Sequence, residues 1–347
     1  MLGAIFGDIV GSIYEFNNIK STQFELIGKR STFTDDSILT IAVADWLLMG
    51  VLNKERLIFI IKQYVKEYPN PLGGYGSRFQ QWAFSSDNEP YKSWGNGSAM
   101  RVAAVGWAFD SLEETEKIAK LTAEITHNHP EGIKGAQATA AAIYMARTCS
   151  TKLEIKEYIE NKYGYNLSRT CDEIRPDYSF NESCAGTVPE AIIAFLDSSD
   201  FESAIRLAVS LGGDSDTLTC ITGGIAEAFY GIPESMVEKV LAYLPSNMKV
   251  VVDKFQKISL CRRSVYFEQF KYYKGERSCP FSSKDSEKVR WWDFEKSYFD
   301  NYKDNKQWSD FLEFFDDWIV RKAAPENNGY DLSKGNPWKE SYYENAP

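Results

Sequence analysis

The stretch GIKGAQATAAAIYMA, residues 132–146, gives the clearest indication of how this chain folds. Its glycines and alanines carry little or no side chain, and its apolar positions recur three and four residues apart, which predicts a helix. The distance between packed helices depends on the side chains at their contact, so small residues let neighbouring helices approach closely. We therefore predict a central helix that other helices surround.

The segments on either side of this helix show the same periodicity. Apolar residues recur at helical spacing over residues 38–48, 57–65, 118–125, 186–196, 199–210 and 216–229. Runs that alternate polar and apolar residues, as strands do, are scarce. The pattern predicts an all-α fold of ten or more helices joined by glycine-rich loops.

The composition is that of an ordinary globular protein, with 44% hydrophobic and 25% charged residues among 347. No run of about 18 uncharged apolar residues is present, so a membrane-spanning helix is not expected. The first residues, MLGAIFGDIVG, lack the basic residues of a secretory signal, and Asp8 interrupts their apolar run. The six cysteines include no C-x-x-C pair, which argues against a zinc or disulfide framework. We expect a cytoplasmic protein.

The chain is acidic, with 39 basic and 49 acidic residues and a formal net charge of −10. Binding to nucleic acid depends heavily on the neutralisation of phosphates, so this charge argues against DNA or RNA as a partner, except as a modified substrate. A local site can still oppose the overall field, and a small phosphorylated ligand is therefore not excluded.

The composition of the chain changes after about Lys257, where aromatic residues become frequent. Twenty-one of its fifty aromatic residues lie between Tyr266 and Tyr343, and the pattern predicts amphipathic helices that cover an apolar surface. We divide the chain into a main domain, residues 1–257, and an aromatic-rich, helical C-terminal extension, residues 258–347. The extension carries fifteen basic and sixteen acidic residues, a balance that disfavours stacking on nucleic-acid bases. We expect it to pack on the main domain or on a partner.

The first candidate site is Thr34-Asp35-Asp36-Ser37, which directly precedes a predicted helix. Such residues are ordinary N-caps, but one cap needs only one such side chain. Adjacent carboxylates also repel each other unless a cation or a proton neutralises them. Helix capping and metal binding both remain open for this motif alone.

The second candidate site is LGGDSDT, residues 211–217, which also lies between two predicted helices. Carboxylates at this density suit Mg²⁺, Mn²⁺ or Ca²⁺ rather than zinc, and the remaining ligands of an EF-hand are missing. If the two Asp-rich loops converge, they offer four carboxylates and two threonine oxygens. That is enough to bridge two hard cations, which can grip vicinal oxygens of a substrate and position water.

The segment GDIVGSIYE, residues 7–15, adds a third polar feature near the N-terminus. In a helix, Asp8, Ser12 and Glu15 would share one face. The apolar residues between them predict a buried helix with a polar edge. A carboxylate at the polar edge of a buried helix, such as that of Glu15, is expected to have a functional role.

Two further segments fit a ligand pocket. GNGSAMR, residues 95–101, is a loop that runs into a helix, so its N–H groups could meet a phosphate. It lacks the spacing of a Walker A or dinucleotide motif, and a capped turn is the alternative. Thr126-His127-Asn128-His129-Pro130 holds both histidines of the chain, with no cysteine or third histidine to support zinc. One histidine here can pack on an adenine or bind a phosphate, whereas an ordinary loop histidine is the simpler interpretation of His129.

Taken together, these motifs resemble the ADP-ribosylglycohydrolase family, which includes the dinitrogenase-reductase-activating glycohydrolases and the ADP-ribosyl-acceptor hydrolases. The resemblance rests on GDIVGSIYE, FTDDS, GNGSAMR, THNHPEG, AGTVPEA and LGGDSDT, which follow in this order over about residues 1–255. It implies an all-α orthogonal multi-helix bundle with a two-metal site. The aromatic extension departs from the common family domain, which leaves substrate choice and oligomeric state open.

The resemblance also implies roles for individual residues. Two Mg²⁺ or Mn²⁺ ions would be held by Thr34, Asp35, Asp36, Asp214, Asp216 and Thr217. ADP-ribose would be held by Asn96, Gly97 and Ser98, at its diphosphate and nearby ribose, and by His127 in the cleft. Glu15 corresponds to the family's acidic residue beside the metals. The Gly73-Gly74-Tyr75-Gly76 loop is similar to a segment near the cleft in bacterial members.

The resemblance therefore implies a metal-dependent hydrolase that cleaves the glycosidic bond between ADP-ribose and a modified protein or small molecule, and so reverses ADP-ribosylation. The candidate acid/base groups are Glu15 and Asp36. A carboxylate that ligates a metal carries protons poorly, so we prefer Glu15 as the catalyst and give Asp36 mainly a metal role. ADP-ribosyl-arginine is the favoured substrate. A two-metal phosphoesterase acting on a nucleotide and a non-catalytic ADP-ribose-binding module are the alternatives.

Overall fold

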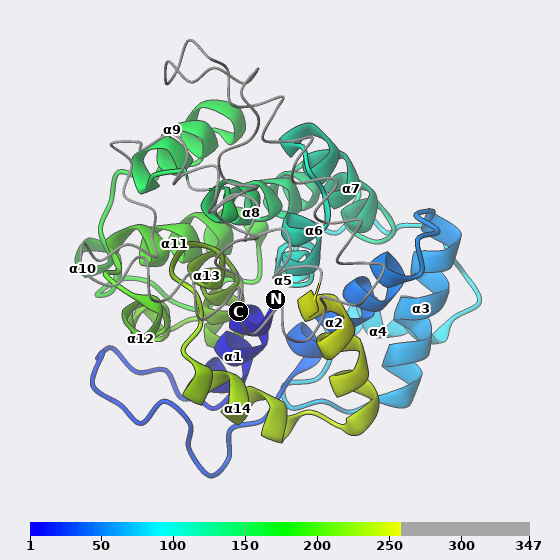
Figure 1. Ribbon diagram of the computed structural model, residues 1–347, viewed down its shortest axis with the longest axis horizontal. Coiled ribbons are helices and arrows are strands. Elements are labelled where there is room, and N and C mark those ends of the chain that lie inside the picture. Colours follow the sequence, from blue (N-terminus) through cyan, green and yellow to red (C-terminus); the bar gives the residue numbers. More distant parts are fainter. Residues whose placement is uncertain (149, 258–347) are drawn as a thin grey trace, which may run out of the picture. The chain divides into compact units, whose positions relative to one another are not determined.

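The computed structural model describes residues 1–148 and 150–257, all within the compact unit Met1–Ser259 (Figure 1). These ranges contain no strand and form α1 (Leu2–Gly11), α2 (Asp35–Leu48), α3 (Lys54–Glu67), α4 (Ser77–Phe84), α5 (Gly97–Met100), α6 (Ala103–Ala108), α7 (Leu112–Glu124), α8 (Pro130–Arg147), α9 (Lys152–Tyr163), α10 (Cys171–Ile174), α11 (Cys184–Asp197), α12 (Phe201–Leu211), α13 (Ser215–Tyr230) and α14 (Glu234–Tyr243). Residues 246–257 are helical as well. The prediction of an all-α fold is confirmed. The predicted extension, residues 258–347, lies outside the described residues.

Helix α8 contains the small-residue stretch 132–146 and packs against six others, α5, α6, α7, α9, α11 and α13. Its glycines allow this close packing. A Cβ atom on Gly135 would lie 2.4 Å from the Sγ atom of Cys184, at the start of α11, a distance that real contacts do not reach. The prediction of a central, surrounded helix is confirmed.

Helices α1 and α13 are in close backbone contact, because glycines recur every four residues along α1. A Cβ atom on Gly3 would lie 2.3 Å from the backbone oxygen of Gly223, and one on Gly11 would lie 2.4 Å from that of Ser215. Gly7, between them, meets α13 in the same way. The numbering falls along one helix as it rises along the other, so the two helices are antiparallel. The end of α1 therefore meets the start of α13.

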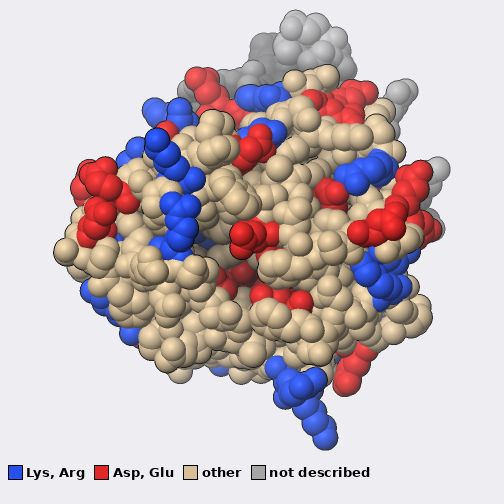
Figure 2. Space-filling model, turned by 180° about the vertical axis from the view of Figure 1, so that it is seen from behind, with Lys and Arg blue, Asp and Glu red and all other residues tan. Residues whose placement is uncertain are grey.

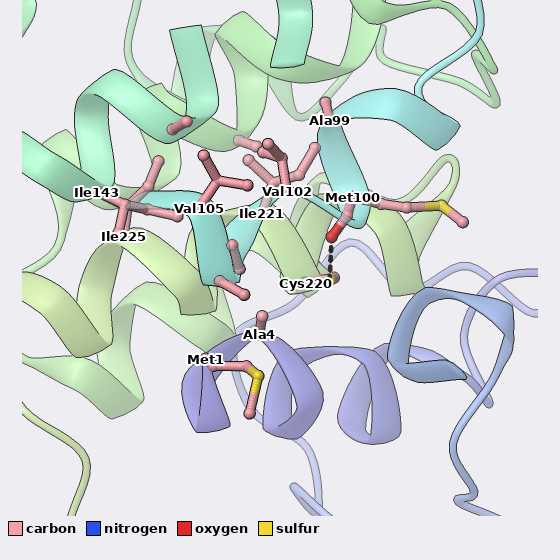
Figure 3. Packing of buried hydrophobic residues seen from close by; sticks show 14 of the residues in the cluster. Met1, Ala4, Ala99, Met100, Val102, Val105, Ile143, Cys220, Ile221 and Ile225 are labelled. Atoms are coloured by element: carbon pink, nitrogen blue, oxygen red, sulfur yellow. Dashed lines mark hydrogen bonds between the residues drawn. The ribbon is translucent and has the colours of Figure 1, made fainter. Parts of the chain in front are cut away.

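Apolar side chains from α1, α5, α6, α8 and α13 share one core (Figure 3). Val105, Ile143 and Ile225, from three of these helices, are completely buried within it. Cys220 on α13 also donates a hydrogen bond from its Sγ atom to the backbone oxygen of Met100 on α5, at 3.4 Å. The loop that precedes α5 is therefore held on the same core as the Asp-rich loops.

The described part of the chain contains three cysteines that are buried and form no disulfide, Cys171, Cys184 and Cys220. Burial raises the pKa of the Cys184 thiol to about 12, so this group stays protonated. None of the helices described here combines the length and the apolar character needed to cross a bilayer.

Candidate active site

The first Asp-rich segment forms the start of α2. Thr34 is the N-cap residue, and its Oγ1 atom accepts a hydrogen bond from the backbone N–H of Asp36 at 3.2 Å. Capping therefore accounts for Thr34 alone. The carboxylates of Asp35 and Asp36 are not needed for capping the helix, so capping does not explain their presence.

Asp8 on α1 holds this segment in place. Its carboxylate accepts hydrogen bonds from the backbone N–H groups of Thr34 and Ser37, at 2.9 and 3.0 Å, and from both of their hydroxyl groups. The residue is fully buried, and burial raises the pKa of its carboxyl group to about 6. The spacing of residues 8, 12 and 15 indicates a polar face for Asp8 but no role for its carboxylate. A carboxylate inside an apolar helix with glycines at every fourth position is the signal that marks it.

The second Asp-rich segment ends at the start of α13. Gly212 and Gly213 have φ angles of +72° and +71°, a left-handed conformation that favours glycine. The Oδ1 atom of Asn18 accepts a hydrogen bond from the N–H of Gly213 at 2.7 Å. Its Nδ2 atom donates to the backbone oxygen of Glu15 at 3.0 Å. Asn18, which the sequence analysis did not single out and for which no motif gives a signal, thus joins the Glu15 turn to this loop.

Glu15 does not lie on α1, so the prediction of one helix through residues 8–15 was wrong. The helix ends at Gly11, and Ser12 is its C-cap residue. The N–H of Tyr14 then bonds to the oxygen of Gly11 in a turn, and the side-chain amide of Asn18 donates to the backbone oxygens of Tyr14 and Glu15. The half-buried carboxylate of Glu15 reaches the second Asp-rich loop from this turn.

The two loops and the turn bring their carboxylates together. One oxygen each from Glu15, Asp214 and Asp216 lies within 4.8 Å of the other two. The hydroxyl of Thr217 donates to the Oδ2 atom of Asp36 at 3.3 Å, which connects the start of α13 to the start of α2. Among the described residues, no ion pair includes any of these carboxylates. Figure 2 shows acidic side chains gathered in and around a hollow on one face of the protein.

The proximity of these groups makes ionisation costly. Burial, aided by neighbouring carboxylates, raises the pKa values of Asp35, Asp36 and Asp216 well above their usual range. The pKa of Glu15 rises to about 7, first through burial and then through the charges of Asp214 and Asp8. Such shifts arise where carboxylates crowd together without a cation.

Two carboxylate oxygens in the cluster are buried without any hydrogen-bond partner, Oδ1 of Asp36 and Oε2 of Glu15. A buried oxygen that could carry negative charge is expensive to leave unpaired. Hard divalent cations prefer oxygen ligands of this kind, so the donor set fits Mg²⁺ or Mn²⁺.

The glycine loop over residues 73–76 lies against the same carboxylate. A Cβ atom on Gly73 would be 2.6 Å from the Oε2 atom of Glu15, and Gly73 has a φ angle of +78°. An isolated bridge between Thr34 and Leu72 holds the loop beside the first Asp-rich segment. The structure therefore brings this loop to the carboxylate cluster.

The loop before α5 reaches the cluster through Asn96. Its Nδ2 atom donates to the Oδ2 atom of Asp214 at 2.7 Å. Gly97 is partly exposed and packs beside His127, where a Cβ atom would lie 3.1 Å from the Nε2 atom. Ser98 is fully buried, and its hydroxyl donates to a backbone oxygen in the first turn of α8 at 2.7 Å. Ser98 thus anchors the loop, and its hydroxyl is already engaged.

The two histidines have different surroundings. His129 is the N-cap residue of α8, and its Nδ1 atom accepts a hydrogen bond from the N–H of Glu131 at 3.1 Å. His127 is buried, and its pKa lies well below the usual value because of burial and then the positive charges of Arg101 and Arg78. Within the described residues, the possible metal-binding group contains carboxylates and neither histidine.

The fold and this site define an all-α protein with a cluster of carboxylates at the starts of two helices. The chain matches the ADP-ribosylglycohydrolase family over residues 1–263 and belongs to that family. Membership confirms the resemblance seen in the motifs and supports a hydrolase that acts on ADP-ribose linkages.

Individual relatives are distant. The chain is 27% identical to ADP-ribosylhydrolase ARH3 of Mus musculus, an alignment that covers 68% of this chain and 84% of the relative. It is 23% identical to ADP-ribosylarginine hydrolase Tri1 of Pseudomonas putida (strain GB-1), over 69% of this chain and 72% of that protein. A solved ADP-ribosylglycohydrolase-related protein complex contains a chain with a TM-score of 0.58 and 23% identity, covering 74% of this chain and 97% of that one. This likeness shows a shared fold.

Proposed function

We propose that the protein is a divalent-metal-dependent hydrolase that cleaves the glycosidic bond between ADP-ribose and an acceptor group. The observation that carries the proposal is the meeting of buried carboxylates from α2, α13 and the turn after α1. Within residues 1–148 and 150–257, two of their oxygens have no hydrogen-bond partner and no cationic side chain is paired to them. The substrate is an ADP-ribosylated protein or small molecule, and the enzyme acts in the cytoplasm.

The ligands for two Mg²⁺ or Mn²⁺ ions are Thr34, Asp35, Asp36, Asp214, Asp216 and Thr217. Such ions, when bound, supply Lewis acidity to vicinal oxygens of the substrate and neutralise the charge of the cluster. Asp8 has a different task, because its oxygens are already engaged by Thr34 and Ser37. It holds the first Asp-rich segment in the conformation that binding requires.

Glu15 is the acid/base group in this proposal. Its half-buried carboxylate lies beside Asp214 and Asp216 but outside the proposed ligand set, so it stays free to take up and release a proton, which suits general acid/base chemistry. Its Oε2 atom has no hydrogen-bond partner, and the missing side chain of Gly73 leaves room beside it. Glu15 would take a proton from the attacking water as the bond to the acceptor breaks, and would then give that proton to the released acceptor, so that the elements of water add across the bond. Asp36, which accepts a hydrogen bond from Thr217, remains mainly a metal ligand.

The Asn96-Gly97-Ser98 loop and His127 hold the ADP-ribose. The loop binds the diphosphate and the nearby ribose, with Ser98 fixing its position on α8. The name of the Pseudomonas putida relative specifies ADP-ribosylarginine, and we favour an arginine side chain as the acceptor for this protein too.

The proposal is tested by offering arginine-, serine- and nucleotide-linked ADP-ribose with Mg²⁺, Mn²⁺ or EDTA. We expect release of intact ADP-ribose, fastest from arginine and abolished by EDTA. Release of AMP or phosphate would instead identify a two-metal phosphoesterase. Tight binding of ADP-ribose without release from any of these substrates would identify a non-catalytic binding module.

A further inference from the structure

A positive charge is buried behind the Asn96–Ser98 loop without a counterion. Arg101, directly after α5, is completely buried, and its Nη2 atom donates to the backbone oxygen of Thr122 and to the Oγ1 atom of Thr126, at 2.8 and 2.9 Å. Its Nε and Nη1 atoms have no hydrogen-bond partner in the part of the chain that the structure describes. No carboxylate among the described residues forms an ion pair with it. A buried charge of this kind is costly unless something compensates it.

The hydrogen bond from Arg101 to Thr126 fixes the direction of the hydrogen bond between Thr126 and His127. An arginine side chain can only donate, so the Oγ1 atom of Thr126 accepts from it. The hydrogen of that fully buried hydroxyl then has one acceptor among its contacts, the Nδ1 atom of His127 at 2.7 Å. The reverse direction would leave the hydroxyl hydrogen buried without a partner, which costs free energy.

His127 is neutral, because burial and the charge of Arg101 hold its pKa well below the usual value. A neutral imidazole carries one N–H group. Since Nδ1 accepts a hydrogen bond from Thr126, the hydrogen lies on Nε2. This atom faces the loop, 3.1 and 3.6 Å from the places where Cβ atoms on Gly97 and Gly95 would be. The two glycines leave the Nε2 atom open.

We propose that Arg101 and Thr126 are positioning residues that lock His127 with its hydrogen on Nε2. His127 then presents an N–H donor, backed by the buried guanidinium, to an anionic group of the ligand at the Gly95–Gly97 loop. The inference rests on the proposed function, in which the diphosphate of ADP-ribose occupies this loop. The charge of Arg101 is then balanced by the ligand instead of by a carboxylate of the protein.

The tautomer is measured by nitrogen NMR of protein labelled with ¹⁵N-histidine, in the absence of ligand. The chain has two histidines, and His129→Asn assigns the signals while keeping a good N-cap residue. We expect His127 to show a protonated Nε2 and an unprotonated Nδ1. Thr126→Val should shift it towards a mixture of tautomers, and Thr126→Ser should restore the wild-type spectrum. A protonated Nδ1 in the wild type would overturn the inference.

The effect on binding is measured by calorimetry with ADP-ribose. We expect Thr126→Val to weaken binding about tenfold, the size of one hydrogen bond, with rescue by Thr126→Ser. Thr122→Val is the matched control, because it removes a buried hydroxyl one turn earlier that donates to Ala119 and does not contact His127. Equal affinities of the Thr126→Val and wild-type proteins would overturn the inference.

The role of Arg101 is tested separately with Arg101→Met, after circular dichroism has shown that the variant folds. We expect a mixed tautomer and a rise in the pKa of His127 in the NMR titration, because a nearby positive charge is lost. An unchanged spectrum would remove Arg101 from the proposal. If the variant does not fold, the Thr126 variants decide the inference. A wild-type protein that does not bind ADP-ribose would refute the proposed function, while the nitrogen spectrum would still decide the tautomer.

Discussion

Two buried regions of opposite charge meet at Asn96. On one side, its side chain binds Asp214, which belongs to a cluster of carboxylates without a paired cation. On the other side, the adjacent Gly97 packs on His127, behind which Arg101 is buried with no anion of the described residues paired to it. Each region is costly by itself. Together they fit a ligand that is held through cations at one end and carries its own negative charge at the other.

The two regions are also built differently. The carboxylates lie in short loops at helix starts, where a run of polar residues is visible in the sequence. The cationic region depends on one residue directly after α5 and on two in the segment after α7, which are joined by hydrogen bonds between their side chains. This difference predicts that substitutions in the first region abolish chemistry, whereas those in the second mainly change affinity.

The largest expected effect comes from Glu15→Gln. The change keeps the shape of the side chain but removes proton transfer, which contributes about 10²- to 10⁴-fold to such reactions. We expect the turnover number to fall by that factor, while affinity for ADP-ribose stays within about threefold of the wild type. Glu25→Gln, at an exposed position in the same connection between α1 and α2, is the matched control. Near-normal turnover would reject Glu15 as the catalyst.

The next effect is stabilisation by divalent cations. A ligand that binds only the folded state stabilises it by about 2.7 kcal/mol at a concentration one hundred times its Kd. We expect Mg²⁺ or Mn²⁺ at such a concentration to raise the midpoint of thermal unfolding relative to EDTA. Asp214→Asn combined with Asp216→Asn should remove the increase, and the exposed Asp253→Asn should keep it. An increase of equal size in the double variant would show that the cations bind at a site that does not need Asp214 and Asp216.

The metal-free protein should lose stability as pH rises from about 4 to 7. The pKa of Glu15 is raised from 4.5 to about 7, and that of Asp8 from 3.8 to about 6. In this window the folded state keeps protons that the unfolded state has released, so the free energy of unfolding falls with pH. Urea unfolding in EDTA measures how steeply the free energy of unfolding falls with pH. Saturating Mn²⁺ should reduce this slope. A flat or rising profile in EDTA would show that the carboxylates are not crowded as described.

The smallest expected effect comes from Gly97→Ala in the cationic region. The added Cβ atom would lie 3.1 Å from the Nε2 atom of His127 and partly cover that donor. We expect affinity for ADP-ribose to fall severalfold, with little change in turnover at saturating substrate. Gly28→Ala is the matched control, because its Cβ atom would make a contact of similar tightness, 3.2 Å from the Cδ1 atom of Ile13, outside the Asn96–Ser98 loop. A large loss of turnover with unchanged affinity would contradict the division between the two regions.

Local patterns were sufficient for the helices and for the loops at their starts. Capping residues, small-residue faces and apolar spacing act over a few residues, and each helix predicted from periodicity between residues 38 and 229 is present in the structure. The pattern was misleading for Glu15, because the chain leaves the helix at Gly11 and continues as a turn in which Asn18 binds the backbone oxygens of Tyr14 and Glu15. Nothing in the spacing of residues 7–15 indicates that interruption.

What the sequence by itself determined was the all-α class and the two Asp-rich loops, together with the family to which they point. The tertiary structure alone decided which of these groups meet. Asn18 contacts Gly213 across 195 residues of chain, and the glycines of α1 bring the end of that helix beside the start of α13. The hydrogen bonds that orient His127 likewise require Arg101, 25 residues before Thr126. Local sequence sets backbone preferences, whereas the charge and proton state of a buried group depend on every neighbour that the fold places around it.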